Sequence, residues 1–237
     1  MEIFLDFYGT LVYEDDEMIP IVCEHVRSSS KTICEVKDIG DYWWKVLSAA
    51  FRNSYGDTFK TQRNLGISSL SETIQNYNSS CVAEDIIQIQ FDHWQKPEIF
   101  DDTKPFLQSL HGLTTVILSN IDTKDIHEAK RYHGIHVNDV ITSEDVKSYK
   151  PNPELFQEAL RRFNLNSNEV IHIGDSLSSD VSGAQNVGIK AIWLNRFHKR
   201  TPDGIIPDYI CKDLFEVRDV LNNLLRACNN PMYKIVY

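Results

Sequence analysis

From about Thr114 onward, short apolar runs alternate with amphipathic helical patterns. The runs TTVILSN, DVITS, EVIHIGD and IKAIWLN have the length and β-branched content of strands. Between them, residues 123–132, 153–163 and 179–187 have helical spacing. Such alternation predicts a parallel sheet with helices on both faces, and runs such as VIHI and AIWL fit strands buried on both sides. We therefore expect an α/β fold, a Rossmann-like doubly wound parallel sheet.

A further strand and a helical segment precede this region. The run IFLDFYGTLV, residues 3–12, predicts a strand that ends before a Gly-Thr turn. Residues 13–97 contain no convincing strand, and SYGDTF is their clearest turn; helical patterns lie around residues 19–27, 39–52, 65–77 and 85–94. We interpret the segment as an inserted all-helical domain, with residues 13–96 in that domain and residues 1–12 and 97–237 in the α/β core.

Composition narrows the classes of function. The chain has 237 residues and a formal net charge of -10, which disfavours nonspecific binding to a nucleic-acid backbone. An anionic small substrate would need a local metal or lysine. No stretch resembles a signal peptide or membrane span, so we expect a cytoplasmic protein without a membrane partner. We expect the protein to be a monomer or a homodimer. The odd number of cysteines and the lack of CxxC spacing argue against a disulfide framework or zinc site; they are Cys23, Cys34, Cys81, Cys211 and Cys228.

Polar residues follow four of the predicted strands. In an open parallel sheet, ligands bind beyond the carboxyl ends of the strands. Taken singly, an aspartate at a strand end is often a turn former, Ser-Asn is a common cap, and a lysine before proline is usually solvated. Two carboxylates in GDSLSSD are more specific, because burying them unpaired is costly. Their convergence favours a functional site that contains Asp6, Ser119, Asn120, Lys150, Asp175 and Asp180.

These residues resemble the motifs of the haloacid dehalogenase-like hydrolase superfamily. Its four motifs occur in order, as IFLDFYGT, VILSN, Lys150 in SYKPNP, and GDSLSSD. The resemblance covers essentially the whole chain. The helical insertion is similar to the C1 cap of the subfamily that includes phosphoglycolate phosphatase, phosphonatase and the 2-haloacid dehalogenases.

The resemblance implies a role for each matching residue. Asp6 would be the nucleophile that forms a covalent aspartyl intermediate. Asp175 would bind Mg²⁺ together with Asp6 and the backbone carbonyl of Tyr8. Asp180 would reach the metal through water or fix Lys150. The remaining implied roles are catalytic for Ser119 and Lys150, which would contact the transferring group, and substrate-binding for Tyr8, Thr10 and Asn120.

Tyr8 leaves the reaction open between alternatives. Family phosphatases have an aspartate here that protonates the leaving oxygen, and a phenol is a poor substitute near neutral pH. L-2-haloacid dehalogenases carry a similar DxYGT motif, because a halide leaves without a proton, but they lack the metal that Asp175 indicates. We expect a magnesium-dependent phosphatase acting on a small anionic metabolite. The alternative is 2-haloacid dehalogenase-like hydrolysis at carbon; phosphonoacetaldehyde hydrolysis and a non-catalytic ligand-binding module are more remote.

The resemblance implies that the helical insertion determines which substrate is bound. Arg52, Tyr55 and Arg63 flank the SYGDTF turn. An arginine there could bind a carboxylate or phosphate of the substrate. The more common alternative is an exposed arginine on a helix surface with no ligand. Of Trp43 and Trp44, an amphipathic helix normally buries one ring. The sequence does not name the substrate.

Overall fold

The computed structural model describes residues 1–200 and 204–229, with side chains to residue 227; the side chain of Cys228 and the tail from residue 230 lie outside the described residues. Six parallel strands form one sheet in the order β3-β2-β1-β4-β5-β6. The central strand β1 pairs with β2 on one side and β4 on the other. The strands are β1 (Glu2–Leu5), β2 (Thr115–Ser119), β3 (Asp139–Thr142), β4 (Val170–Gly174), β5 (Lys190–Leu194) and β6 (Tyr209–Cys211).

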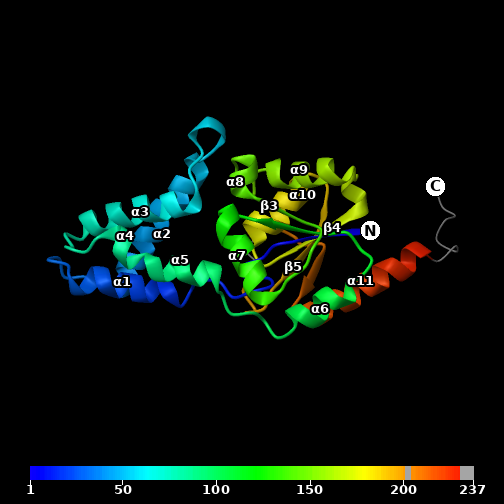
Figure 1. The fold of residues 1–237 in the computed structure, drawn as a ribbon, viewed down its shortest axis with the longest axis horizontal. Coiled ribbons are helices and arrows are strands. Elements are labelled where there is room, and N and C mark those ends of the chain that lie inside the picture. The colour runs from blue at the N-terminus through cyan, green and yellow to red at the C-terminus, as the bar shows by residue number, and fades with distance from the viewer. Residues whose placement is uncertain (201–203, 230–237) are drawn as a thin grey trace.

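Helices cover both faces of the sheet, as predicted. On one face lie α6 (Thr103–Ser109), α7 (Thr123–His133) and α11 (Leu214–Asn229). On the other lie α8 (Ser143–Val146), α9 (Glu154–Phe163) and α10 (Gly183–Asn186), and the two sets appear below and above the sheet in Figure 1. Alternating side chains of β1 to β5 supply the two cores. Ile3 and Leu5 face one core, whereas Phe4 packs with Leu155 and Phe156 in the other.

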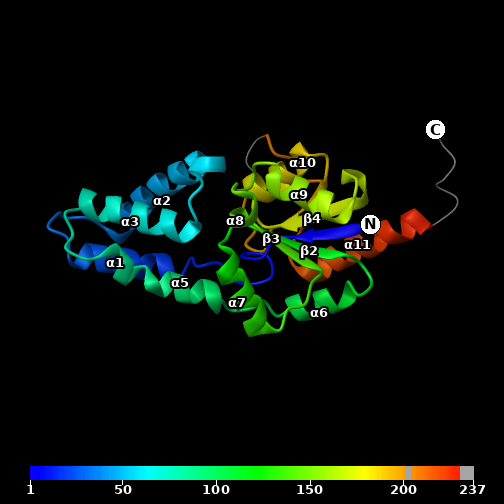
Figure 2. The same ribbon diagram turned by 45° about the horizontal axis from the view of Figure 1, so that its top comes forward.

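The part of the chain between β1 and α6 forms a helical layer beside the sheet. It contains α1 (Met18–Ser28), α2 (Val36–Asn53), the short 3₁₀ turn η1 (Gly56–Thr58), α3 (Gln62–Asn76), α4 (Ala83–Ile86) and α5 (Gln88–Gln95). Figures 1 and 2 show these helices grouped at the carboxyl ends of the strands, opposite the N-terminus of the chain. Most of their buried apolar side chains belong to the same cluster as Ile3 and Leu5. The layer therefore faces the edge of the sheet where a ligand would bind.

Two helix predictions need correction. The single helix expected over residues 85–94 is divided into α4 and α5 at Ile87. The helix expected over residues 179–187 begins as the π-helical turn η3 (Leu177–Ser182) and continues as α10. In η3 the Ser176 carbonyl accepts from the amides of both Asp180 and Val181, so the turn is set by local hydrogen bonds rather than apolar spacing. The sequence patterns did not predict β6, α6, α8, α11 or the 3₁₀ turn η2 (Ser167–Glu169).

Candidate active site

The predicted strand-end residues meet at one cavity of about 730 Å³. Its floor is the carboxyl edge of β1, β2 and β4 with the following loops, and its roof is the helical layer. Side chains from α2 form a largely apolar wall, which includes Trp44, Leu47 and Phe51. The cavity joins segments that are far apart in the sequence; the predicted residues that line it are Asp6, Tyr8, Ser119, Asn120, Lys150, Asp175 and Asp180.

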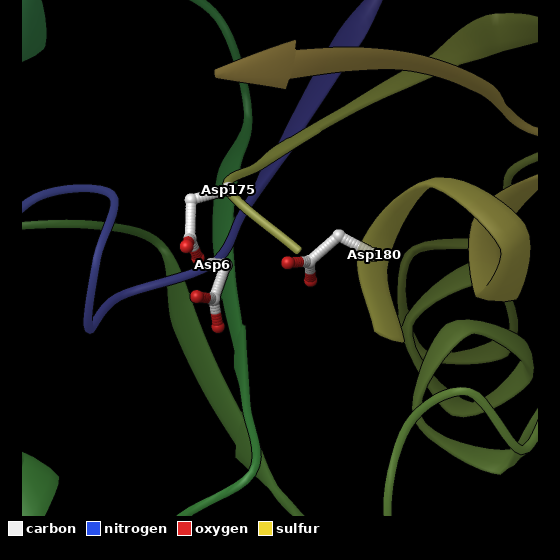
Figure 3. A group of neighbouring side chains, drawn as sticks. All are labelled: Asp6, Asp175 and Asp180. Carbon is white, nitrogen blue, oxygen red and sulfur yellow. The ribbon is translucent and has the colours of Figure 1, made fainter. Parts of the chain in front are cut away.

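Three carboxylates converge at the floor of this cavity. Each of Asp6, Asp175 and Asp180 offers an oxygen, and these oxygens lie within 4.8 Å of one another. Figure 3 shows Asp6 and Asp175 side by side at the ends of neighbouring strands, with the Asp180 carboxylate approaching from the adjacent helical turn. The backbone packs tightly here, because a Cβ on Gly9 would lie 2.7 Å from the Asp175 carboxylate. Gly9 also has φ +77°, so glycine suits this turn on both counts.

Lys150 joins two of these carboxylates. Its Nζ donates to Asp6 Oδ1 at 2.7 Å, to Asp180 Oδ1 at 2.6 Å and to the Leu118 carbonyl at 2.8 Å. An ammonium group has three N–H donors, so all of them are used. Although burial opposes its charge, Asp180 and Asp6 hold the pKa of Lys150 above its ordinary value. Lys150 therefore fixes the Asp6 carboxylate through one oxygen.

Asp180 is fully engaged by protein donors. Its Oδ1 accepts from Lys150 and lies 3.0 Å from His172 Nε2, and its Oδ2 accepts from the Ser176 amide at 3.1 Å. Burial opposes ionisation, but Lys150 and His172 hold the pKa of Asp180 below its ordinary value. Of the two roles predicted for Asp180, this geometry supports the one in which it fixes Lys150.

Neighbouring cations balance the negative charges of Asp6 and Asp175 only in part. Burial, reinforced by neighbouring carboxylates, raises the pKa of each to about 7 from the ordinary 3.8, even though Lys150 lowers that of Asp6. The nearest cation to Asp175 is the exposed Lys199, whose Nζ is 3.5 Å from Oδ2. Buried carboxylate oxygens without a full counter-charge fit a hard divalent cation. The residues present therefore suit the Mg²⁺ that the motifs imply.

Ser119, Asn120 and Thr10 are placed differently from one another. Ser119 ends β2 at the cavity wall and is only 2% exposed. The Asn120 amide pairs with the backbone of Lys150 in both directions, at 2.7 and 3.0 Å, so it holds the lysine loop in place. Thr10 lies fully buried behind the cavity wall, with its carbonyl bonded to Arg196 and its hydroxyl unpartnered. This placement gives no support to the predicted substrate contact of Thr10, because its side chain is fully buried and does not line the cavity.

The Tyr8 hydroxyl bonds to the helical layer. It donates to the backbone carbonyl of Trp94 in α5 at 2.5 Å. Burial, with the charges of Asp125 and Asp15, raises the pKa of Tyr8 well above its ordinary value. Trp94 in turn donates from its indole to Asp15 Oδ2 at 2.6 Å, and Gln90 donates to the same oxygen at 2.7 Å.

The candidate specificity residues of the insertion also separate. Arg63 is committed to Asp125 through two bonds of 2.7 Å, so it is not a free anion-binding group. Arg52 is exposed and lines the cavity. Trp43 is buried and donates to Ser69, whereas Trp44 is 64% exposed and lines the cavity. As predicted, the helix buries one ring of the pair.

Several cavity residues were missed by sequence reasoning. Asp15 and Glu14 follow the Gly-Thr turn after β1 and line the cavity, and Glu14 keeps much of its side chain in solvent. Burial against the protein and nearby acids, chiefly Asp16 and Asp6, raise the pKa of Glu14 to about 7. The acidic run YEDDE was the available indication. Nothing in the sequence indicated His172 or Trp94, because their roles depend on tertiary contacts.

Comparisons with known proteins agree with the fold and the motifs. A model of the haloacid dehalogenase-like hydrolase family matches residues 3–188. Haloacid dehalogenase-like hydrolase domain-containing protein 3 of Danio rerio is 32% identical over 125 residues, 51% of each chain. Pyrimidine 5'-nucleotidase YjjG of Escherichia coli is 35% identical over 83 residues, 35% of this chain and 37% of that protein. Glyceraldehyde 3-phosphate phosphatase of Methanopyrus kandleri is 32% identical over 99 residues, 39% of this chain and 42% of that protein.

The chain thus spans about half the length of the first of these relatives and less of the others. Solved structures match over a larger share. L-2-haloacid dehalogenase RSc1362 superposes with a TM-score of 0.77 at 18% identity, over 93% of this chain and 98% of that one. The magnesium-bound HAD-hydrolase YfnB of Bacillus subtilis gives 0.74 at 19% identity, with the same coverage. At these identities, the likeness establishes a shared fold. Among the helices that the structure describes, none has the length and apolarity needed to cross a membrane.

Proposed function

The chain belongs to the haloacid dehalogenase-like hydrolase family, and from this membership and the site geometry we propose that it is a magnesium-dependent hydrolase of phosphatase type. Its substrate is a small phosphorylated metabolite. Two of the matched relatives are named as a nucleotidase and a phosphatase, which is consistent with this class of reaction. The reaction takes place in the cavity between the sheet edge and the helical layer.

Asp6 is the proposed nucleophile. Lys150 holds Oδ1, so Oδ2 is free to attack phosphorus and form an aspartyl phosphate, which water then hydrolyses. Ser119, which ends β2 at the cavity wall, is the proposed hydrogen-bond donor to a phosphoryl oxygen. Asp180 acts through Lys150, because both of its oxygens already accept protein hydrogen bonds.

Asp6, Asp175 and the backbone carbonyl of Tyr8 are the proposed Mg²⁺ ligands. The observation that carries this assignment is the pair of buried carboxylates, Asp6 and Asp175, each with its pKa raised to about 7. Two such groups side by side without a matching cation are unfavourable, and a divalent ion would neutralise both. When bound, Mg²⁺ supplies positive charge that stabilises the oxygens of the transferring phosphoryl group.

A metal-dependence assay tests this function. Phosphate release from p-nitrophenyl phosphate should require Mg²⁺, stop with EDTA, and fall by at least about 10³-fold in Asp6→Asn, because the covalent route is lost. Asp57→Asn, the same change on the exposed η1 turn, should leave the rate unchanged. Activity that is indifferent to EDTA would overturn the proposal.

The second candidate is hydrolysis at carbon, of the 2-haloacid dehalogenase type. Tyr8 favours it, because it replaces the acid that phosphatases use, and a halide needs no proton. Halide release from 2-chloropropionate without added metal would establish this reaction. Thermal stabilisation by phosphate compounds with no turnover of esters or haloacids would instead indicate a ligand-binding module.

A further inference from the structure

The hydroxyl of Tyr8 is already used in the protein. It donates to the backbone carbonyl of Trp94, at 2.5 Å. Trp94 lies in the last turn of α5, where carbonyl groups lack partners within the helix. The two preceding carbonyls, of Asp92 and His93, accept from the Lys96 amide. Tyr8 thus satisfies a carbonyl at a half-buried helix end, and releasing the phenol would leave that carbonyl without its donor.

A phenol has a single O–H, so the bond to Trp94 removes the proton donor that its position would otherwise offer to a leaving group. Two other polar groups of the cavity, Lys150 and Asp15, are already hydrogen-bonded within the protein. Lys150 uses all three N–H groups on protein acceptors. The Asp15 carboxylate accepts two hydrogen bonds on one oxygen, from Trp94 and Gln90, so it is held against the helical layer. Among the described residues that line the cavity, Glu14 is the one acid not yet given a role. Whether Glu14 protonates the leaving group is tested below with its own variant.

Resting on the proposed phosphatase function, we propose that the site hydrolyses phosphoryl compounds whose leaving group departs as a stable anion. Aryl phosphates, acyl phosphates and phosphoric anhydrides belong to this class, whereas simple alkyl phosphates do not. Asp6 forms the bond to phosphorus as the bond to the leaving oxygen breaks, and that oxygen takes the electron pair without a proton. Water then attacks the phosphorus of the aspartyl phosphate; Asp6 is regenerated, and the phosphate product takes up the proton that water loses.

A matched pair of substrates tests the leaving-group requirement. p-Nitrophenyl phosphate and benzyl phosphate both present an aromatic ring to the apolar wall of the cavity, but the first releases a phenolate and the second an alkoxide. With Mg²⁺, kcat/KM for p-nitrophenyl phosphate should exceed that for benzyl phosphate by at least about 10²-fold, the usual contribution of a general acid. Tyr8→Asp, which supplies a carboxyl group, should raise benzyl phosphate hydrolysis by about 10-fold or more.

Two variants serve as controls. Tyr8→Phe removes only the hydroxyl and should leave the ratio of the two substrates within about 2-fold of wild type, since that hydroxyl donates no proton to substrate. Glu14→Gln should likewise leave the ratio unchanged. Comparable rates for both substrates in wild type would overturn the inference, as would a selective loss of benzyl phosphate activity in Tyr8→Phe or Glu14→Gln. No phosphate release from either substrate would instead reject the phosphatase function itself.

Discussion

Lys150 is held in a fixed position beside Asp6, the proposed nucleophile. Its three hydrogen bonds hold it among Asp6, Asp180 and the Leu118 carbonyl, so its location is fixed before substrate arrives. A group that is already oriented needs no reorganisation when charge develops on the phosphoryl group. Asp180 depends in turn on His172, which is fully buried and packs edge-on against Phe156. The chain from His172 to Asp6 therefore consists of buried polar contacts.

A pair of substitutions at His172 tests this chain. Burial lowers the pKa of His172, so the neutral ring donates from Nε2 to Asp180. His172→Phe keeps a ring but loses the donor, and we expect kcat for p-nitrophenyl phosphate to fall about 10-fold with KM nearly unchanged, the scale of one hydrogen bond to a charged group. His172→Gln, whose amide can still donate, should retain most of kcat. Equal losses in both variants would show that His172 serves packing alone.

Motif residues were predictable from the sequence, and their partners were not. Asp6, Lys150 and Asp175 follow recognisable strand ends, so the topology of a parallel sheet brings them to one edge. The Tyr8 contact with Trp94 spans 86 positions and depends on how α5 approaches the sheet. The substrate contact expected of Thr10 stays a prediction, because its side chain is fully buried and does not line the cavity.

The start of α3 forms a polar junction between the helical layer and α7, which packs on the sheet. Asp122, before α7, accepts from the amides of Gln62 and Arg63 at 2.7 and 3.0 Å, and a carboxylate at a helix N-terminus is favourable. Arg63 then binds Asp125, which also accepts from Gln95. The ends of α3 and α5 are thereby attached to one helix of the sheet domain.

Breaking this junction should be costly. Asp125 is buried, so Arg63→Met would leave its carboxylate with only Gln95 as donor, and we expect the free energy of unfolding to fall by about 3 kcal/mol in urea denaturation. The double variant Arg63→Met with Asp125→Leu should recover much of that loss, because it removes the unpaired charge. Double-variant stability no better than that of Arg63→Met would contradict this account.

At the level of elements, periodic segments were predicted well and irregular ones poorly. The face of α9 expected to be apolar is buried at Leu155, Phe156 and Ala159. The break at Ile87 has no proline or glycine to mark it, and η3 is a short turn fixed by the Ser176 carbonyl. Hydrophobic spacing reports which face is buried but carries little information about such local hydrogen bonding.

Charge couples the site to the stability of the whole molecule. In metal-free protein, Asp175 keeps its proton to about pH 7, whereas in the unfolded chain it releases it near its ordinary pKa of 3.8. Between these values the folded state binds more protons than the unfolded state, so the free energy of unfolding falls as pH rises through this window. This loss of stability is absent below pH 3.8 and complete above about pH 7. The proposed Mg²⁺ should offset this loss of stability, because it would bind the folded state with both carboxylates ionised.

Asp175→Asn separates this contribution from all other titrating groups. Near pH 8 in EDTA the variant should be more stable than wild type by roughly 2 kcal/mol in urea denaturation, because it lacks the undercompensated charge, and the difference should vanish near pH 4. Added Mg²⁺ should raise the unfolding midpoint of wild type but not that of Asp175→Asn. A wild-type protein at least as stable as the variant at pH 8 without metal would mean that Lys199 and Lys150 already neutralise the site, and the electrostatic basis for a bound cation would be lost.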